Sequence, residues 1–202
     1  MKKLIIGTTN KAKVDQIRGA LMSVGIEVCG LPKDIVLPSI LEDGENAKDN
    51  ARKKASTFAR ALNQRVLSMD NSLYLDGLPK EKQPGVHVRR IPGYTGRPSD
   101  EALLNYYSAL LEGLGGKVNG YWEFAICVAK PNGEFEETVI KEPRIFVSER
   151  CKAVSSGYPL ESLQIDPDTG KYTAEMTETE RDEFWQKAIG KELCDFVSKL
   201  NL

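Results

Sequence analysis

The chain has 202 residues, of which 41% are hydrophobic and 28% charged, and its formal net charge is −1. This composition is typical of a globular protein, and the length suits a single domain over residues 1–202, with or without an extra lobe. The balanced charge argues against a nucleic-acid binder. No apolar run approaches the roughly 18 residues that cross a bilayer. Four scattered cysteines indicate reduced thiols rather than a zinc site or a disulfide framework, and no leader is expected, so the sequence predicts a cytoplasmic protein.

The chain opens with a predicted buried strand over residues 3–8, followed by a helix over residues 11–24. Apolar residues of this helix recur three and four positions apart, as one face of an amphipathic helix requires, at Val14, Ile17, Leu21 and Val24. Gly25 is a suitable helix stop, and a second strand is expected at residues 26–29.

A long helix is predicted over residues 46–62. Strand-like runs at residues 65–69 and 73–75 follow, and Asp70-Asn71-Ser72 is expected to separate them. Residues 76–98 are rich in glycine, proline and charge and are predicted to be loop.

A helix is expected over residues 99–114. Asn132-Gly133 between residues 121–130 and 134–141 is a strong hairpin signal. Another strand is predicted over residues 144–154, and a last helix begins with the capping-box pattern Thr177-Glu178-Thr179-Glu180 and continues to Leu200. Helices that alternate with strands early and a hairpin that comes late predict an α/β fold with a mixed sheet flanked by helices.

The first candidate site is the end of the first strand, where Thr8, Thr9 and Asn10 precede Lys13. A strand that leads into a helix N-terminus presents free N–H groups and the positive end of the helix dipole to an anion. The alternative is that Thr9 or Asn10 only caps the helix and that the lysines are solvated. The P-loop pattern is absent.

The second candidate is the acidic stretch that begins at Glu42. Acidic residues such as Asp49 are favoured at a helix start by the helix dipole, which is a sufficient structural explanation for them. Glu42 precedes the helix in a loop, where its carboxylate could coordinate a hard cation such as Mg²⁺. Lys54 lies on the same helix and is either surface charge or a phosphate contact.

The third candidate is Asp70, which follows a strand. Ligands of open α/β sheets gather at the carboxyl ends of strands, so an aspartate there could act as a base or a metal ligand. The alternative is an Asx turn at Asp70-Asn71.

Together, the order and spacing of these motifs resemble the inosine triphosphate pyrophosphatase family, whose members hydrolyse deaminated purine nucleoside triphosphates to the monophosphate and pyrophosphate. Thr8–Lys13 is similar to the family's T-x-N-x-x-K phosphate loop, and residues 42–55 are similar to its E-x-G…E-N-A…K-A segment, with Asp49 in place of Glu. Asp70 falls where the family has its essential aspartate. The resemblance covers nearly the whole chain and is most specific in the first half.

The resemblance implies a mixed central sheet with a cleft between two lobes, and hydrolysis assisted by Mg²⁺ held by Glu42 and Asp70. Asp70 would orient or deprotonate a water that attacks the α-phosphorus. It also implies a homodimer. The absence of a nucleic-acid or membrane partner is expected from the net charge and from the lack of a long apolar run. The residues implied to bind substrate are Thr8, Thr9, Asn10, Lys13, Lys54, Arg90, Phe124, Tyr158 and Lys187.

The chain departs from the family pattern on the side that recognises the base. Trp185, Gln186 and Lys187 stand where the family has Ser-His-Arg. A site built on hydrogen bonds rejects analogues that lack them, so this change could alter the substrate. The alternatives are therefore a hydrolase of another nucleotide, a non-catalytic nucleotide-binding module on the same fold, and an interaction domain in which each motif is only a cap or a turn.

Overall fold

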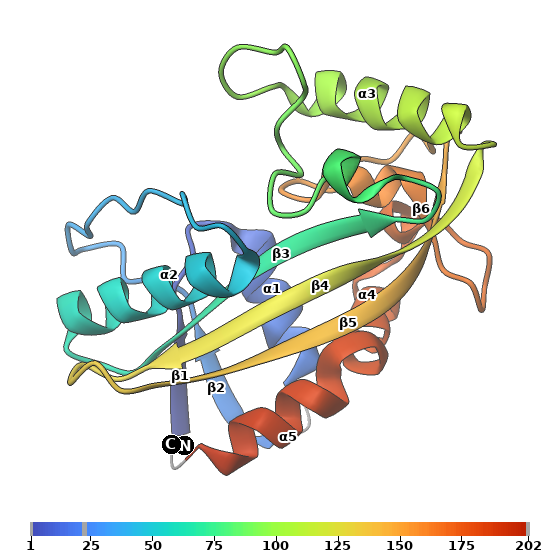
Figure 1. Ribbon diagram of the computed structural model, residues 1–202. Coiled ribbons are helices and arrows are strands. Elements are labelled where there is room, and N and C mark those ends of the chain that lie inside the picture. The colour runs from blue at the N-terminus through green and yellow to red at the C-terminus, as the bar shows by residue number, and fades with distance from the viewer. Residues whose placement is uncertain (1, 22–23, 201–202) are drawn as a thin grey trace. The chain divides into compact units, whose positions relative to one another are not determined.

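The computed structural model describes residues 2–21 and 24–200, and these residues divide into two compact units (Figure 1). The first unit takes its residues from 1–71, 124–140 and 182–202, and the second from 72–123 and 141–181. The strands form one six-stranded sheet in the order β2-β1-β3-β4-β5-β6. No helix among the described residues is long and apolar enough to cross a membrane.

Three parallel strands form the centre of the first unit: β1 (Lys2–Ile6) pairs with β2 (Ile26–Cys29) on one side and with β3 (Val66–Leu75) on the other. β4 (Lys117–Ala129) and β5 (Phe135–Val147) follow β3 in the sheet, and their hairpin turn closes through a hydrogen bond from Lys130 N to Glu134 O. The predicted hairpin and mixed α/β sheet are confirmed.

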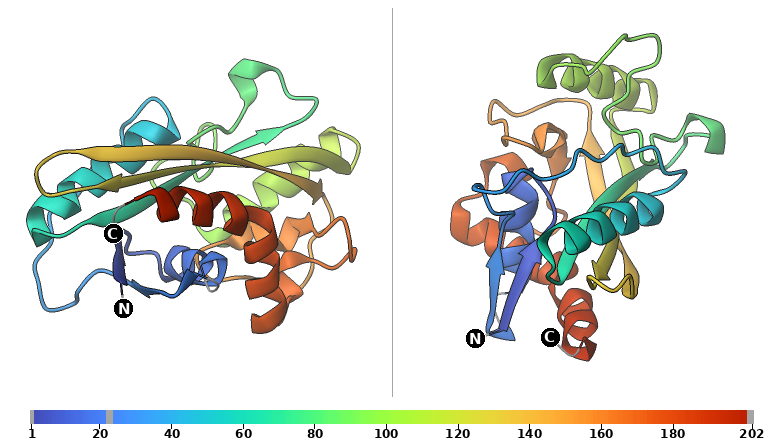
Figure 2. Two further views of the ribbon diagram at one scale, coloured as in Figure 1. Left: turned by 90° about the horizontal axis from the view of Figure 1, so that it is seen from below. Right: turned by 90° about the vertical axis from the view of Figure 1, so that its left-hand side faces the viewer.

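Helices α1 (Lys11–Ala20) and α2 (Ala47–Leu62) connect the parallel strands of the first unit. The buried face of α2 consists mostly of small side chains, including Ala47, Ala51 and Ala55, which lets the helix pack closely. α1 contacts the C-terminal helical segment, which covers Gln186–Lys199, and Figure 2 gives two further views of these helices.

The second unit has a core between α3 (Asp100–Gly113) and the far ends of the long strands. The buried side chains of this core are Leu73, Leu75, Leu103, Leu104, Tyr107, Leu111, Val118, Phe146, Leu160 and Leu163. β6 (Gln164–Ile165) pairs antiparallel with β5, and short 3₁₀ helices occupy Lys80–Lys82, Pro159–Leu163 and Thr173–Glu175. The remainder of residues 76–98 is loop, as predicted.

Two strand predictions are wrong. β3 runs without interruption through Asp70-Asn71-Ser72, because Asp70 and Ser72 are buried in the sheet and Asp70 has long-range partners in place of a local Asx turn. β5 ends at Val147, so no separate strand covers residues 144–154. Arg144 lies within β5, and the chain bends after Val147.

The last helix is not continuous. α4 (Glu178–Trp185) is followed by a π-helical turn (Gln186–Gly190) and then by α5 (Lys191–Lys199). The interruption coincides with close packing on α1, where a Cβ on Gly190 would lie 3.0 Å from the carbonyl oxygen of Ala20. The observed helix α1 ends at Ala20 and is therefore shorter than the predicted helix over residues 11–24. Residues 22 and 23 of the predicted range lie outside the described residues.

Candidate active site

The carboxyl end of β1 lies unusually close to β3. Gly7 N donates a 2.7 Å hydrogen bond to Leu67 O, and Gly7 O accepts one of 3.0 Å from Ser68 Oγ. A Cβ on Gly7 would collide with the side chains of Ser68, Val66 and Phe58. The absence of a side chain at Gly7 therefore allows β1 to end beside the segment of β3 that leads to Asp70.

The start of α1 is capped by the residues predicted to bind phosphate. Asn10 Oδ1 accepts a 2.9 Å hydrogen bond from Ala12 N, and Thr8 Oγ1 accepts one of 3.1 Å from Asn10 N. Thr9 is exposed. The cap that sequence analysis gave as the alternative for Asn10 is therefore present. A helix cap and an anion site can share the same helix terminus.

Two lysines from different helices converge on Asp70. Lys54 Nζ lies 2.8 Å from Asp70 Oδ1, and Lys13 Nζ lies 3.6 Å from the same oxygen. Both ammonium groups also donate to the carbonyl oxygen of Met69, at 3.3 Å from Lys54 and 3.2 Å from Lys13. Only the family resemblance linked Lys13, Lys54 and Asp70 in the sequence. The structure brings these three residues together within the first unit.

Glu42 joins this cluster through Lys54, since its Oε1 lies 3.4 Å from Lys54 Nζ. The Glu42 side chain is about half exposed, whereas those of Lys54 and Asp70 are less than a tenth exposed. The Lys54 ammonium therefore lies within reach of both carboxylates, one buried and one open to solvent.

Burial lowers the pKa of Lys13 from its usual value of 10.5 to about 8. Repulsion from the neighbouring Lys54 lowers this pKa as well, whereas Asp70 and Glu42 act in the opposite direction. Lys13 is thus a cation at neutral pH, but its burial and the nearby Lys54 make the charged form less stable than it would be in water. An anion bound beside it would offset this loss of stability.

The two carboxylates fit a divalent cation in a limited sense. No group of three or more His, Cys, Asp or Glu side chains that could hold a metal occurs among the described residues. Mg²⁺ bound with a nucleotide commonly uses only one or two protein carboxylates, and phosphate oxygens and waters complete its coordination. Glu42 and Asp70 already approach one shared cation, the Lys54 ammonium, so their chemistry suits such a site.

The residues predicted to contact the base are dispersed between the two units. Phe124 is buried and packs edge-on against Trp185, with ring centroids 6.1 Å apart, which favours the packing alternative for both. Lys187 is exposed in the π turn of the first unit. Tyr158 lies in the second unit, in a turn closed by a hydrogen bond from its N–H to Ser155 O. Arg90, which was predicted to contact the phosphates rather than the base, is exposed in the same unit.

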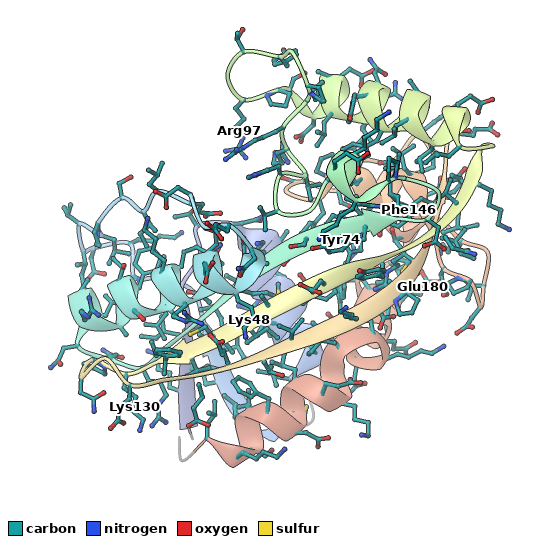
Figure 3. All side chains as sticks on the ribbon, viewed as in Figure 1. Lys48, Tyr74, Arg97, Lys130, Phe146 and Glu180 are labelled. Atoms are coloured by element: carbon teal, nitrogen blue, oxygen red, sulfur yellow. The ribbon has the colours of Figure 1, made fainter. Side chains whose placement is uncertain are left out.

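Sequence analysis missed two features around this cluster. Asn50 is buried and bonds to both Asp70 and Gly44. On another side of α2, Lys48 (labelled in Figure 3) and Arg52 pair with Glu137 of β5, at 2.8 Å and 2.9 Å. The E-N-A pattern marked Asn50 as a family residue but did not predict its contacts. No sequence pattern near Glu137 predicted its pairing with α2.

The fold and the cluster together define the class of the protein. It is an α/β protein in which two helices and a loop bring Lys13, Lys54 and Glu42 to Asp70 of strand β3. A model of the Ham1 family matches residues 4–190, and the chain belongs to that family. The assignment made from the sequence motifs is thereby confirmed.

Curated relatives and solved structures agree with this assignment. The chain is 34% identical over 190 residues to a dITP/XTP pyrophosphatase of Exiguobacterium, covering 90% of this chain and 87% of that protein. It is 29% identical to a dITP/XTP pyrophosphatase of Listeria monocytogenes over 99% of this chain and 98% of the relative. The fold matches a HAM1 protein from Coxiella burnetii with a TM-score of 0.72 at 17% identity, covering 98% and 100% of the two chains.

Proposed function

We propose that this protein hydrolyses deaminated purine nucleoside triphosphates, such as dITP and XTP, to the nucleoside monophosphate and pyrophosphate. Two observations support the proposal. Similar relatives carry this activity in their names. In the first unit two lysines approach Asp70, and one of them, Lys54, also approaches Glu42. The convergence on Asp70 is the observation on which the proposal depends most, because caps and turns alone would not bring these groups together.

Lys13 and Lys54 would bind the triphosphate. Their ammonium groups supply positive charge next to the N-terminus of α1, whose N–H groups and dipole also favour anions. Thr8, Thr9 and Asn10 would add contacts at the same terminus. Phosphoryl transfer is catalysed mainly by positioning and by stabilising the charge that develops, and these groups provide both.

Asp70 would orient a water for in-line attack on the α-phosphorus. The new bond forms between the water oxygen and this phosphorus, the bond to the bridging oxygen breaks, and pyrophosphate leaves. Asp70 would accept the proton of the water. Its carboxylate is held by Lys54 at Oδ1 and by Asn50 at Oδ2, which fixes its orientation.

Glu42 and Asp70 would hold the divalent cation, which we propose to be Mg²⁺. The ion would supply charge neutralisation for the phosphates when it is bound. We further propose a homodimer, following the resemblance, and a cytoplasmic location, following the scattered cysteines. Sedimentation of the purified protein would test the dimer.

The base would be recognised by residues outside this cluster, with Tyr158 and Lys187 as the remaining candidates, whereas Arg90 would add a contact to the phosphates. The buried packing of Phe124 on Trp185 makes Phe124 a weaker candidate. Because Trp185-Gln186-Lys187 replaces the family's Ser-His-Arg, the accepted base is the part of the proposal that most needs measurement.

Release of pyrophosphate from a panel of nucleoside triphosphates tests the proposal. The panel would hold dITP, XTP, the four standard ribonucleotides and pyrimidine analogues, with Mg²⁺. We expect turnover of dITP or XTP that is lost in Asp70→Asn and Glu42→Gln. Tight binding of a triphosphate without hydrolysis would favour the non-catalytic module, and full activity in both variants would refute the site.

A further inference from the structure

Asn50 lies in the first turn of α2 and is buried, although its side chain is fully polar. Its Nδ2 donates a 3.1 Å hydrogen bond to Asp70 Oδ2, and its Oδ1 accepts a 2.8 Å hydrogen bond from Gly44 N. A buried amide with both ends in use contributes rigidity, because loss of either partner leaves a polar group without a hydrogen bond.

These two bonds join parts of the site that are distant in sequence, and they act beside Lys54, which contacts both Glu42 and Asp70. Asp70 belongs to β3, twenty positions away in sequence, and Gly44 belongs to the loop that carries Glu42. Asn50 thus connects the buried carboxylate to the loop of the exposed one. The carboxylate oxygen that it binds is Oδ2, whereas Lys54 and Lys13 approach Oδ1, so the three groups fix the plane of the Asp70 carboxylate between them.

The loop is fitted to this contact. A Cβ on Gly44 would lie 2.6 Å from Asn50 Oδ1 and 2.9 Å from Asp49 Cβ. Both distances are shorter than side chains tolerate, so glycine is required for the loop to come within hydrogen-bond distance of the amide. The glycine of the Glu42-Asp43-Gly44 motif therefore has a structural reason that involves Asn50.

We propose that Asn50 is a positioning residue that orients the Asp70 carboxylate and holds the Glu42 loop against it. An amide can perform both roles, because one end donates to a carboxylate while the other accepts from a backbone N–H. The catalytic part of this inference rests on the proposed function, whereas the structural link between loop and carboxylate does not.

Three variants separate the two bonds of Asn50. Asn50→Leu removes both at similar volume. Asn50→Asp keeps an acceptor for Gly44 N but places a second carboxylate against Asp70, in a site that also contains Lys13, Lys54 and Glu42. The matched control is Asn46→Ala, which removes the N-cap of the same helix, where Asn46 Oδ1 accepts from Asp49 N at 3.0 Å, and does not touch Asp70.

The first measurement is independent of activity and uses NMR on the 22.4 kDa protein. Exchange of the Gly44 amide hydrogen should be at least about tenfold faster in Asn50→Leu, because the amide loses its partner, and close to the wild-type rate in Asn50→Asp and Asn46→Ala. The carboxyl ¹³C signal of Asp70 should shift in both Asn50 variants and stay in place in Asn46→Ala. Unchanged Gly44 exchange, or an unchanged Asp70 signal, in Asn50→Leu would overturn the inference.

The second measurement is the steady-state kinetics of triphosphate hydrolysis. A misplaced Asp70 should lower kcat by about tenfold or more in Asn50→Leu with KM changed much less, whereas the control should keep kcat within about twofold although its helix is less stable. Equal kcat in Asn50→Leu and Asn46→Ala would refute the positioning role.

A wild-type protein that hydrolyses no triphosphate would refute the proposed function. The NMR results would then still decide whether Asn50 links the Glu42 loop to the Asp70 carboxylate.

Discussion

The Lys54 ammonium lies 2.8 Å from Oδ1 of Asp70, and both side chains are less than a tenth exposed. Lys13 approaches the same oxygen from α1, so one carboxylate faces two cations in a poorly solvated place. Ammonium groups that are already poorly solvated are a suitable environment for a polyanionic substrate.

Replacement of Lys54 should cost both stability and activity. Lys54→Met leaves Asp70 buried with a weaker set of partners, and breaking a buried pair in this way typically costs about 3 kcal/mol of unfolding free energy. The neighbouring Lys53 is the matched control, because its partner Asp43 is exposed and a surface pair contributes little. Denaturant unfolding of both variants should show a large loss for Lys54→Met and almost none for Lys53→Met. Equal losses of unfolding free energy in the two variants would contradict the burial of Lys54 and Asp70.

The binding of triphosphate should weaken above about pH 8, where Lys13 loses its proton. The protonated form binds the anionic substrate, so KM should rise by up to about tenfold between pH 8 and pH 9.5. Lys13→Arg should abolish this rise, because arginine stays charged. Lys11→Met, at an exposed position two residues earlier, should keep it. A KM that is constant with pH in the wild type would show that Lys13 does not contact the phosphates.

The same pKa shift makes Lys13 a source of instability at neutral pH. The pKa is about 8 in the folded protein and 10.5 in the unfolded chain, so the unfolded chain binds more protons between these values. The contribution of Lys13 to the free energy of unfolding therefore rises with pH across that window. Lys13→Met should lack this rise, and it should be more stable than the wild type at pH 7 although it binds substrate poorly. Thermal unfolding of the two proteins at pH 7 and pH 10 measures the difference, and parallel pH dependences would contradict it.

Glu137 should stabilise the first unit by holding α2 to β5. Burial raises its pKa, but hydrogen bonds from Lys48 and Arg52 outweigh this effect and hold the pKa below its usual range. A lowered carboxyl pKa gives stability that is present above the unfolded value of 4.5 and is lost as the pH falls through the folded value. Glu137→Gln should thus lose about 1–2 kcal/mol at pH 7, with little loss in the acid range. The exposed neighbour Glu136, changed to Gln, is the control, and a pH-independent loss in Glu137→Gln would contradict the account.

Local signals predicted most helices and their beginnings. Asn10, Asn46 and Ser99 each cap a helix through a hydrogen bond to a nearby backbone N–H, and such caps are visible in sequence because they involve residues two or three positions apart. The hairpin turn at Asn132-Gly133 is another local signal of this kind.

Predictions failed where distant contacts override local preference. Asp70-Asn71-Ser72 has the composition of a turn, but the sheet buries Asp70 and Ser72, and partners from two helices fix Asp70 within β3. The π turn before α5 depends on packing against α1, which no pattern within the last helix reveals. Both cases show tertiary packing overriding propensity.

The candidate site was predictable in its residues but not in its connections. Glu42, Lys13, Lys54 and Asp70 were named from motifs, and the structure places them within one cluster. The contacts of Asn50, and the pairing of Arg52 with Glu137 85 positions away, depend on how the elements pack, and the sequence of each segment alone does not specify them. The expected cleft between two lobes stays a prediction.

The most direct test of the central claim is hydrolysis of dITP in water enriched in ¹⁸O, with mass spectrometry of the products from the wild type and Asp70→Asn. We expect the wild type to release pyrophosphate and to place one ¹⁸O atom in the nucleoside monophosphate, because water attacks the α-phosphorus. Asp70→Asn should be slower by about two orders of magnitude or more. Label in the pyrophosphate, release of orthophosphate, or an Asp70→Asn variant as fast as the wild type would contradict the claim.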